Sequence, residues 1–208
     1  MNKIQKKILK LGRVENFELK NHSLIFLFMV PTFFGWSYCI HNFSPETSEL
    51  PGARNFFCFL FLVAGMLPNI YKKKAHLFYG WIVFFVIIIF THSSLLNLYN
   101  NHFNIGFLLG FYAVFFGSVL LFNNRVFINI YLVTVFIHLL LALMRSEIDD
   151  ITYNSVLSSF SLMFIFALIL LNDSAAFRYS FADNNKVLEK RKIELKRRSK
   201  TLEEKKMI

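Results

Sequence analysis

Long apolar runs alternate with short polar stretches along the chain of 208 residues. A helix that crosses the hydrocarbon core of a bilayer needs about 20 mainly apolar residues. Six runs reach or approach this length, and the connections between them are short, so we predict six membrane-spanning helices in antiparallel succession. The predicted spans are 23–40, 55–70, 77–96, 105–122, 126–144 and 155–171.

The stretch from Ala75 to Asn124 contains no Asp, Glu, Lys or Arg and is too long for one span. A cluster of polar residues divides it: Asn97, Asn100, Asn101, His102 and Asn104. Because such residues favour turns, we predict two spans joined by a turn at this cluster.

The distribution of charge predicts the orientation of these spans. The chain is 55% hydrophobic and only 17% charged, yet its net charge is +10. The segments before the first span and after the second, fourth and sixth spans together carry +13, and the other three connections carry −3. Cytoplasmic loops of membrane proteins are enriched in Lys and Arg, so we predict that both termini are cytoplasmic.

This pattern divides the chain into three parts: 1–22, 23–171 and 172–208. The first is basic and amphipathic, with Ile4, Ile8 and Leu11 on one helical face. Such a segment suits the surface of an anionic inner leaflet, although a positive anchor that only sets the topology would have the same composition.

The third part resembles a helical stalk that continues the sixth span into the cytoplasm. An apolar residue recurs every seven positions, at Phe181, Leu188, Leu195 and Leu202. Taking these as heptad positions d makes every position a polar, including Asn185. We therefore predict at most a weak parallel coiled coil that joins two copies. The alternative is a charged helix that stays single or lies on the lipid surface.

Catalytic chemistry is not indicated. The predicted spans contain no Asp or Glu, and the chain has no nucleotide-binding glycine motif, nucleophile elbow or zinc-protease motif. Two cysteines without a ligand spacing do not indicate a metal site, and the chain is too apolar for a typical nucleic-acid binder. We expect neither enzyme activity nor nucleic-acid binding from these residues.

His92 and His138 are the one plausible pair of histidines within the predicted bundle. Two imidazoles on neighbouring spans can hold a haem iron, as in a cytochrome b-like anchor, or they can form an ordinary hydrogen bond between helices. The sequence indicates no other cofactor.

Small residues follow one face of the fourth predicted span, at Gly106, Gly110, Ala113 and Gly117. Such a face lets helix backbones approach closely in a membrane. The contact it makes lies either within one bundle or between two copies of the chain. Trp and Tyr residues near the span ends, Trp36 and Trp81 among them, suit the membrane interface.

The start KKILKLGRVENFELKN, the six short-looped spans and the end NNKVLEKRKIELKRRSKTLEEKKMI together resemble the membrane input modules of bacterial signalling proteins. In that family the module precedes a histidine kinase, a nucleotide or diguanylate cyclase, or a PP2C-type phosphatase domain. The resemblance implies a homodimer in the bacterial plasma membrane. It also implies an output domain, whose motifs this sequence does not contain, in a longer or separate chain.

The expected function is therefore sensory input and dimeric anchoring, with a signal that leaves through the C-terminal helix. Two alternatives remain open at this point. One is a small permease or channel subunit for a neutral or lipophilic substrate, and the other is the haem anchor.

Overall fold

The computed structural model describes residues 11–43, 45–71, 74–122 and 124–169, together with residues 191, 192 and 195. The chain divides into two compact units, Met1–Phe160 and Ser161–Ile208. The first holds the helical bundle discussed below. In the second, the described residues are 161–169, 191, 192 and 195, and all are helical.

Helices follow one another along the bundle, and the described residues contain no strand, which confirms the all-α prediction for this part of the chain. The labelled elements are α2 (Asn16–Phe43), α3 (Ala53–Tyr71), the short 3₁₀ helix η1 (Ala75–Leu77), α4 (Tyr79–Asn100), α5 (Ile105–Leu121) and α6 (Arg125–Arg145). A further helix, Asp150–Ile169, follows α6 and runs across the boundary between the two units.

Five of the six predicted spans are helices long and apolar enough to cross a membrane, namely α2, α3, α4, α6 and Asp150–Ile169. The remaining one, α5, has 17 residues. At 1.5 Å per residue it is about 26 Å long, slightly short of a hydrocarbon core of about 30 Å. A membrane crossing by α5 therefore stays a prediction.

Polar side chains set the starts of several helices. Asn104 precedes α5 and its Oδ1 accepts a hydrogen bond from the Gly106 amide at 2.9 Å. Asn124 caps α6 in the same way through the Val126 amide, also at 2.9 Å. These side chains replace the partners that the first amides of a helix lack. Asn104, which we interpreted as part of a turn, is therefore a helix cap as well.

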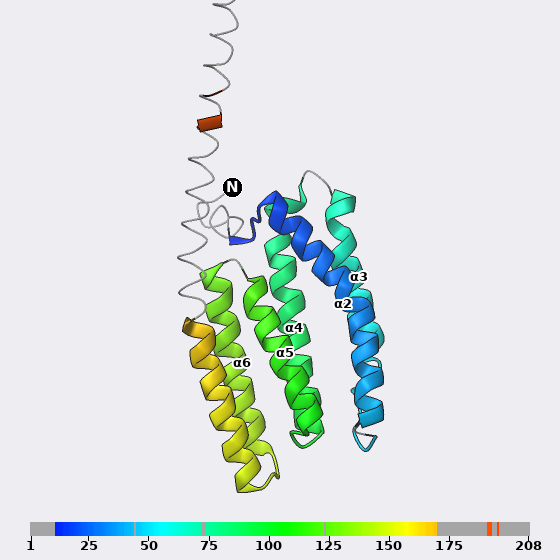
Figure 1. Cartoon of the computed structure of the whole chain (residues 1–208), viewed down its shortest axis with the longest axis vertical. Coiled ribbons are helices and arrows are strands. Elements are labelled where there is room, and N and C mark those ends of the chain that lie inside the picture. Colours follow the sequence, from blue (N-terminus) through cyan, green and yellow to red (C-terminus); the bar gives the residue numbers. More distant parts are fainter. Residues whose placement is uncertain are drawn as a thin grey trace, which may run out of the picture. The chain divides into compact units, whose positions relative to one another are not determined.

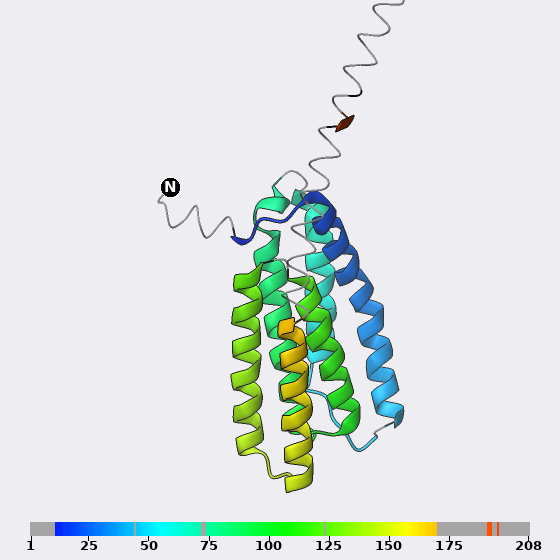
Figure 2. The same ribbon diagram turned by 60° about the vertical axis from the view of Figure 1, so that its left-hand side comes forward.

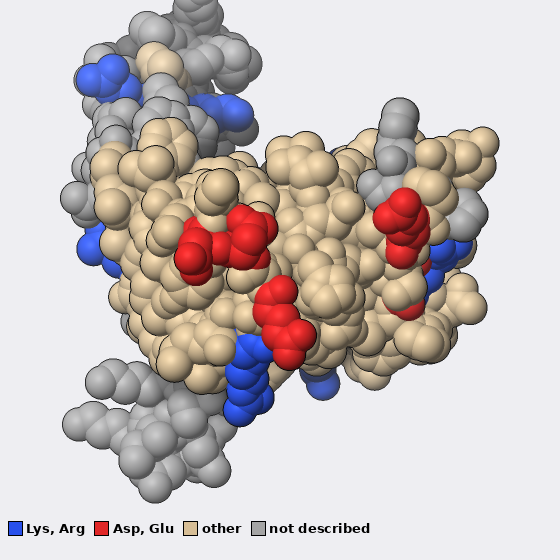
Figure 3. All heavy atoms as spheres, turned by 90° about the horizontal axis from the view of Figure 1, so that it is seen from below, with Lys and Arg blue, Asp and Glu red and all other residues tan. Residues whose placement is uncertain are grey.

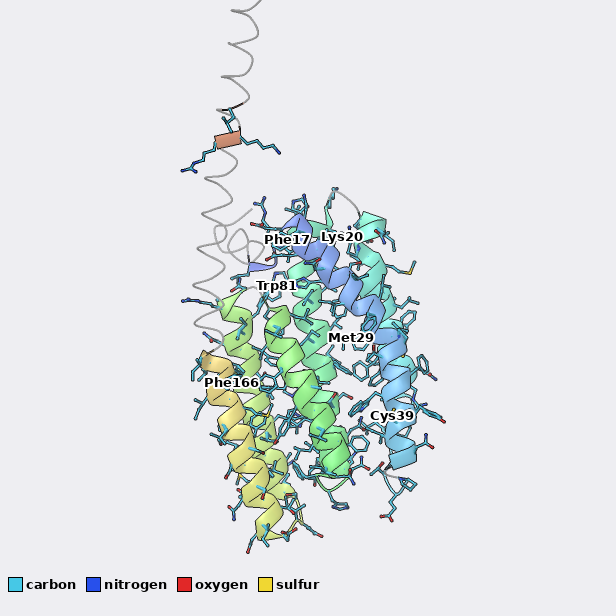
Figure 4. All side chains as sticks on the ribbon, viewed as in Figure 1. Phe17, Lys20, Met29, Cys39, Trp81 and Phe166 are labelled. Atoms are coloured by element: carbon cyan, nitrogen blue, oxygen red, sulfur yellow. The ribbon has the colours of Figure 1, made fainter. Side chains whose placement is uncertain are left out.

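The helices run alternately up and down, so that their connections gather at two ends of the bundle (Figures 1 and 2). We call the end where α2 begins the basic end, because its described cations are Arg13, Lys20, Lys74 and Arg125. The opposite, acidic end exposes most of its carboxylates (Figure 3). Its charged residues are Glu46, Glu49, Arg54, Arg145, Glu147, Asp149 and Asp150. Figure 4 shows Phe17 and Lys20 at the basic end and Cys39 toward the acidic one.

The basic end is closed by a short non-helical segment before α2. The Val14 amide donates to the His76 carbonyl, and the Gly80 amide donates to the Gly12 carbonyl, both at 2.9 Å. Val14 is buried there. The predicted amphipathic stretch is thus not one continuous helix, because residues 13–15 are non-helical and α2 starts already at Asn16. Ile4 and Ile8 lie outside the described residues.

Aromatic side chains fill the core between α2, α3 and α4. Phe90 of α4 lies 4.9 Å from Phe61 and 5.1 Å from Phe57 between ring centroids, and Phe33 of α2 lies 5.5 Å from the same ring. These ring pairs are edge-to-face, the geometry that the aromatic quadrupole favours. The abundant phenylalanines therefore serve as core packing in this region.

The two helices of the α2–α3 hairpin are closely packed. The Ser23 hydroxyl of α2 donates to the Gly65 carbonyl of α3 at 2.6 Å. A Cβ on Gly65 would lie 2.7 Å from Leu27 Cγ and 3.1 Å from the Ser23 carbonyl oxygen. The absence of a side chain at position 65 is therefore what allows the two helices to approach. On the other side of α3, the Tyr79 hydroxyl of α4 donates to the Ala64 carbonyl at 2.8 Å.

We expect Gly65→Ala to destabilise the folded chain by about 1–3 kcal/mol, the usual cost of adding a methyl group to a filled contact. Gly35→Ala is the matched control on α2, because a Cβ there meets nothing within 4 Å. It should be neutral or slightly stabilising, since Ala is a better helix former than Gly. Unfolding of the detergent-solubilised chain by denaturant measures both changes, and equal effects would contradict the contact.

The hydrogen bonds of the Asp149 carboxylate should make the stability of the folded chain depend on pH. Asp149 is exposed, and its two carboxylate oxygens accept from the Thr152 hydroxyl at 2.7 Å and the Thr152 amide at 2.9 Å. These hydrogen bonds, that from the hydroxyl first, lower the pKa of the Asp149 carboxyl. The stabilisation is therefore complete above the ordinary carboxyl pKa and is lost as the pH falls through the lower pKa of the folded state.

We expect Asp149→Asn, which keeps an acceptor oxygen but does not titrate, to lose less thermal stability on acidification than the native chain. Thr152→Val removes the hydroxyl bond and should reproduce part of that flattening. Thermal unfolding recorded across the acidic pH range tests this. Identical profiles for the three chains would show that the hydrogen bonds between Asp149 and Thr152 do not cause the pH dependence.

Candidate functional site

The structure brings together the two histidines that the sequence paired. Nδ1 of His92 on α4 lies 2.7 Å from Nδ1 of His138 on α6, and the ring centroids are 4.9 Å apart. At this distance one ring donates its N–H and the other accepts. Both side chains are half-buried. The pair therefore joins α4 to α6 by a hydrogen bond between two imidazoles.

This arrangement does not fit a haem iron held between the rings. A metal–imidazole bond is about 2.0–2.1 Å long, so two nitrogens on opposite sides of a metal are about 4 Å apart. The two Nδ1 atoms are much closer and bond to each other directly. Among the described residues, no group of three or more His, Cys, Asp or Glu side chains could hold a metal ion. The geometry supports the hydrogen-bond interpretation of the pair.

A second polar contact, not foreseen from the sequence, lies one residue away on α4. The Thr91 hydroxyl is 3.1 Å from the Tyr131 hydroxyl of α6 and 3.4 Å from the Ser118 hydroxyl of α5. All three residues are buried. Ser118 also donates to the Val114 carbonyl of its own helix at 2.6 Å. Three helices therefore meet at one cluster of hydroxyl groups. A single Thr in an apolar run does not predict such a cluster.

A cavity of about 220 Å³ lies between α2, α4 and α5. Its walls are mostly aromatic and aliphatic. The residues that line it are Met29, Thr32, Phe33, Trp36 and Ile40 of α2; Glu49 of the α2–α3 loop; Phe90, Ser94 and Asn97 of α4; and Phe107, Gly110, Phe111, Ala113 and Val114 of α5. Ligand sites are commonly of this type, an apolar hollow with few polar groups.

The acidic end of this cavity is closed by a loop that α4 holds in place. Asn97 Oδ1 accepts from the Leu50 amide at 2.9 Å. Asn101 Oδ1 accepts from the Ser48 amide at 2.9 Å, and Asn101 Nδ2 donates to the Ser48 carbonyl at 2.8 Å. We had placed both Asn residues in a turn. The prediction is confirmed for Asn101, which lies in the turn after α4, but Asn97 belongs to α4, which continues to Asn100. Both side chains bind the loop before α3.

The small residues of α5 have different environments. A Cβ on Gly110 would lie 2.8 Å from Cζ2 of Trp36, so this glycine makes room for the indole of α2 within one chain. Ala113 and Gly117 are exposed, and a Cβ on Gly117 meets nothing within 4 Å. Gly106 is half-exposed. Contact between copies through Ala113 and Gly117 stays a prediction.

The predicted stalk lies mostly outside the described residues, which include neither Phe181, Leu188 nor Leu202. Leu195 is described, is helical and is 67% exposed. Pairing of the stalk stays a prediction.

Two residues that line the cavity were not recognised as site residues from the sequence. Trp36 had only a predicted interfacial role and Phe111 had none, because only tertiary packing places them together.

Comparison of the chain with protein-family models, with curated proteins and with solved structures finds no match. The function is therefore argued from the cavity, the histidine pair and the helices that connect them.

The histidine pair predicts coupled stability effects. We expect His92→Ala and His138→Ala each to destabilise the bundle, and the double variant to lose about 0.6–1.7 kcal/mol less than the sum, the range measured for hydrogen bonds between membrane helices. Ser94→Ala combined with His138→Ala is the control, because the Ser94 hydroxyl bonds only to the Phe90 carbonyl of its own helix, at 2.9 Å. Denaturant unfolding supplies the cycle, and strictly additive losses for the two histidines would contradict the bond.

Proposed function

We propose that this chain is a membrane sensory input and dimerising anchor domain. In this proposal a stimulus acts at the cavity between α2, α4 and α5. The change passes through the helix that begins at Asp150 to residues 172–208. From there it reaches an output domain, a kinase, cyclase or phosphatase, in a longer or separate chain.

The main support for this proposal is Phe111, because it contacts both the cavity and the helix that begins at Asp150. It lines the cavity, and its ring stacks on Phe160 of the Asp150–Ile169 helix with centroids 5.9 Å apart. The neighbouring Tyr112 hydroxyl is hydrogen-bonded to Ser159 of the same helix. A change in the wall of the cavity therefore acts directly on the helix that leads out of the bundle.

Sensing requires two packings whose balance the stimulus shifts. The contact between α2 and α5 supplies a place for such a change, because it contains the cavity, whereas α2 and α3 are closely packed through Ser23 and Gly65. Movement of the α2–α3 hairpin relative to α5 would open or close the cavity without breaking that contact.

The charges supply the proposed orientation. The basic end faces the cytoplasm and the acidic end faces outward, in accordance with the enrichment of Lys and Arg in cytoplasmic loops. Residues 1–10, which contain four of the lysines, then lie beside the anionic inner leaflet. In the same proposal residues 172–208 are also cytoplasmic, where an output domain would be.

A small permease for a neutral substrate is the second candidate, and the same cavity favours it. A carrier must open its site to both sides of the membrane, whereas an input domain need not. Flux of a neutral solute into liposomes that contain only this chain would support the permease. Its absence, with stalk coupling present, would support the input domain.

The proposed function predicts disulfide cross-linking in the stalk. With Cys39 and Cys58 replaced by Ser, we expect Leu188→Cys, Leu195→Cys and Leu202→Cys each to cross-link two copies in membranes several-fold more than Lys190→Cys. Lys190 takes position f of the predicted heptad, away from the predicted seam. Equal yields at all four positions would rule out the paired stalk.

The same assay tests coupling to the cavity. Ser94→Phe fills the cavity from α4 and should change the yield at position 195, whereas Ser93→Phe, the same substitution at the neighbouring half-exposed position that does not line the cavity, should not. Adding Phe111→Ala should remove the effect of Ser94→Phe. If the yield at position 195 is the same in all of these variants, the chain is a dimeric anchor and the cavity is not where it senses a stimulus.

A further inference from the structure

Three polar side chains that line the cavity, those of Thr32, Ser94 and Glu49, bind to other groups of the protein. The Thr32 hydroxyl donates to the Phe28 carbonyl at 2.8 Å, and the Ser94 hydroxyl donates to the Phe90 carbonyl at 2.9 Å. The Glu49 carboxylate forms an ion pair with Arg54 at 2.9 Å. A charged ligand in the cavity would thus lose its hydration and gain no free counter-charge, which is unfavourable. The lining therefore selects a neutral ligand.

The walls provide mainly aromatic surface to such a ligand. Phe33, Phe90 and Phe111 come from three different helices and surround the hollow. A cavity of about 150 Å³ lined by Leu, Ile and Phe stays dry and binds benzene, so apolar cavities of this order are ligand sites without any hydrogen bond to the occupant. At about 220 Å³ the present cavity has room for one ring or a folded segment of a hydrocarbon chain.

The cavity opens sideways, between α2 and α5. Thr32 and Trp36 on α2 and Ala113 on α5 all line it, and all three are exposed, Trp36 by 40%. Ala113 lies at the middle of α5. In a membrane-spanning bundle this position is at the depth of the hydrocarbon core. The opening therefore faces lipid, and the indole of Trp36 rests at its edge against Gly110.

We propose that the cavity binds a neutral, apolar molecule dissolved in the bilayer, such as a hydrocarbon or isoprenoid chain, which enters from the lipid between α2 and α5. The proposal rests on the proposed function, because it names the class of ligand for the same site. Entry from the lipid explains why this opening lies on the side of the bundle and why the loop at residues 48–50 is fixed to α4 across the acidic end.

Tryptophan fluorescence tests this directly, because Trp36 and Trp81 are the two tryptophans of the chain. The full chain with Trp81→Phe, in nanodiscs, reports only on the edge of the cavity. We expect 1-bromodecane to quench Trp36 along a saturable curve, and decane to compete. Decyl sulfate, which has a similar chain with a charge, should compete at least tenfold less well.

Two variants fill the cavity from opposite walls, Ser94→Phe and Ala113→Phe, and each should weaken the apparent affinity for 1-bromodecane at least tenfold. Gly117→Phe on the same helix should leave it unchanged. Trp36→Phe, with Trp81 retained, should show no saturable quenching. Quenching that rises linearly with probe per lipid, or that ignores both filling variants, would overturn the proposal and show partition into the bilayer alone.

This measurement records binding and not output. If the saturable curve is absent but filling the cavity still alters cross-linking at position 195, the ligand class is wrong and the input function stands. If binding is saturable but cross-linking does not respond, the site exists and the proposed signalling role is wrong.

Discussion

The bundle depends on hydrogen bonds that α4 makes in surroundings where lipid offers none. In hydrocarbon, a polar side chain must find its partner inside the protein. Thr91 bonds to α5 and α6, His92 bonds to α6, and Asn97 and Asn101 hold the loop before α3. Thr91 and His92 therefore face α5 and α6, whereas Asn97 and Asn101, the residue that follows α4, face the loop. The positions of α5, α6 and the loop at residues 48–50 are therefore fixed relative to α4, and the cavity lies between elements whose places α4 determines.

The two kinds of packing around α2 have different physical consequences. Toward α3 the contact is filled, with Gly65 allowing the backbones to approach and Phe57 and Phe61 covering the rest. Toward α5 the hollow remains, and atoms at its wall lack the contacts that a close-packed interior provides. A site of this kind lowers stability locally. It also leaves space beside α2 on its side toward α5, which the filled contact with α3 does not have.

Much of the architecture could be predicted from the sequence, because long apolar runs and sorted charges depend on local composition. The spans agree with the helices within a few residues, except at the beginnings of α2 and of the last helix and at the end of α4. The helices also include residues 16–22 and 97–100, because Glu18 and Asn97 form hydrogen bonds there. A count of apolar residues does not take such bonds into account. The pairing of His92 with His138 followed from their positions within the third and fifth predicted spans, because no other pair of histidines was plausible within the bundle. The cavity could not be predicted, because it depends on how Trp36 packs on Gly110.

The segment before α2 has a consequence for the order in which the fold forms. Its carbonyl partners belong to residues far along the chain: Gly12 bonds to Gly80, and Leu11 accepts from the Asn124 side chain at 3.3 Å. A ribosome delivers Gly12 long before α4 and α6 exist. Residues 11–14 are therefore synthesised before their partners and are among the last to reach their final contacts. Closure of the basic end marks the completion of the bundle, and a chain interrupted before Asn124 would leave this end open.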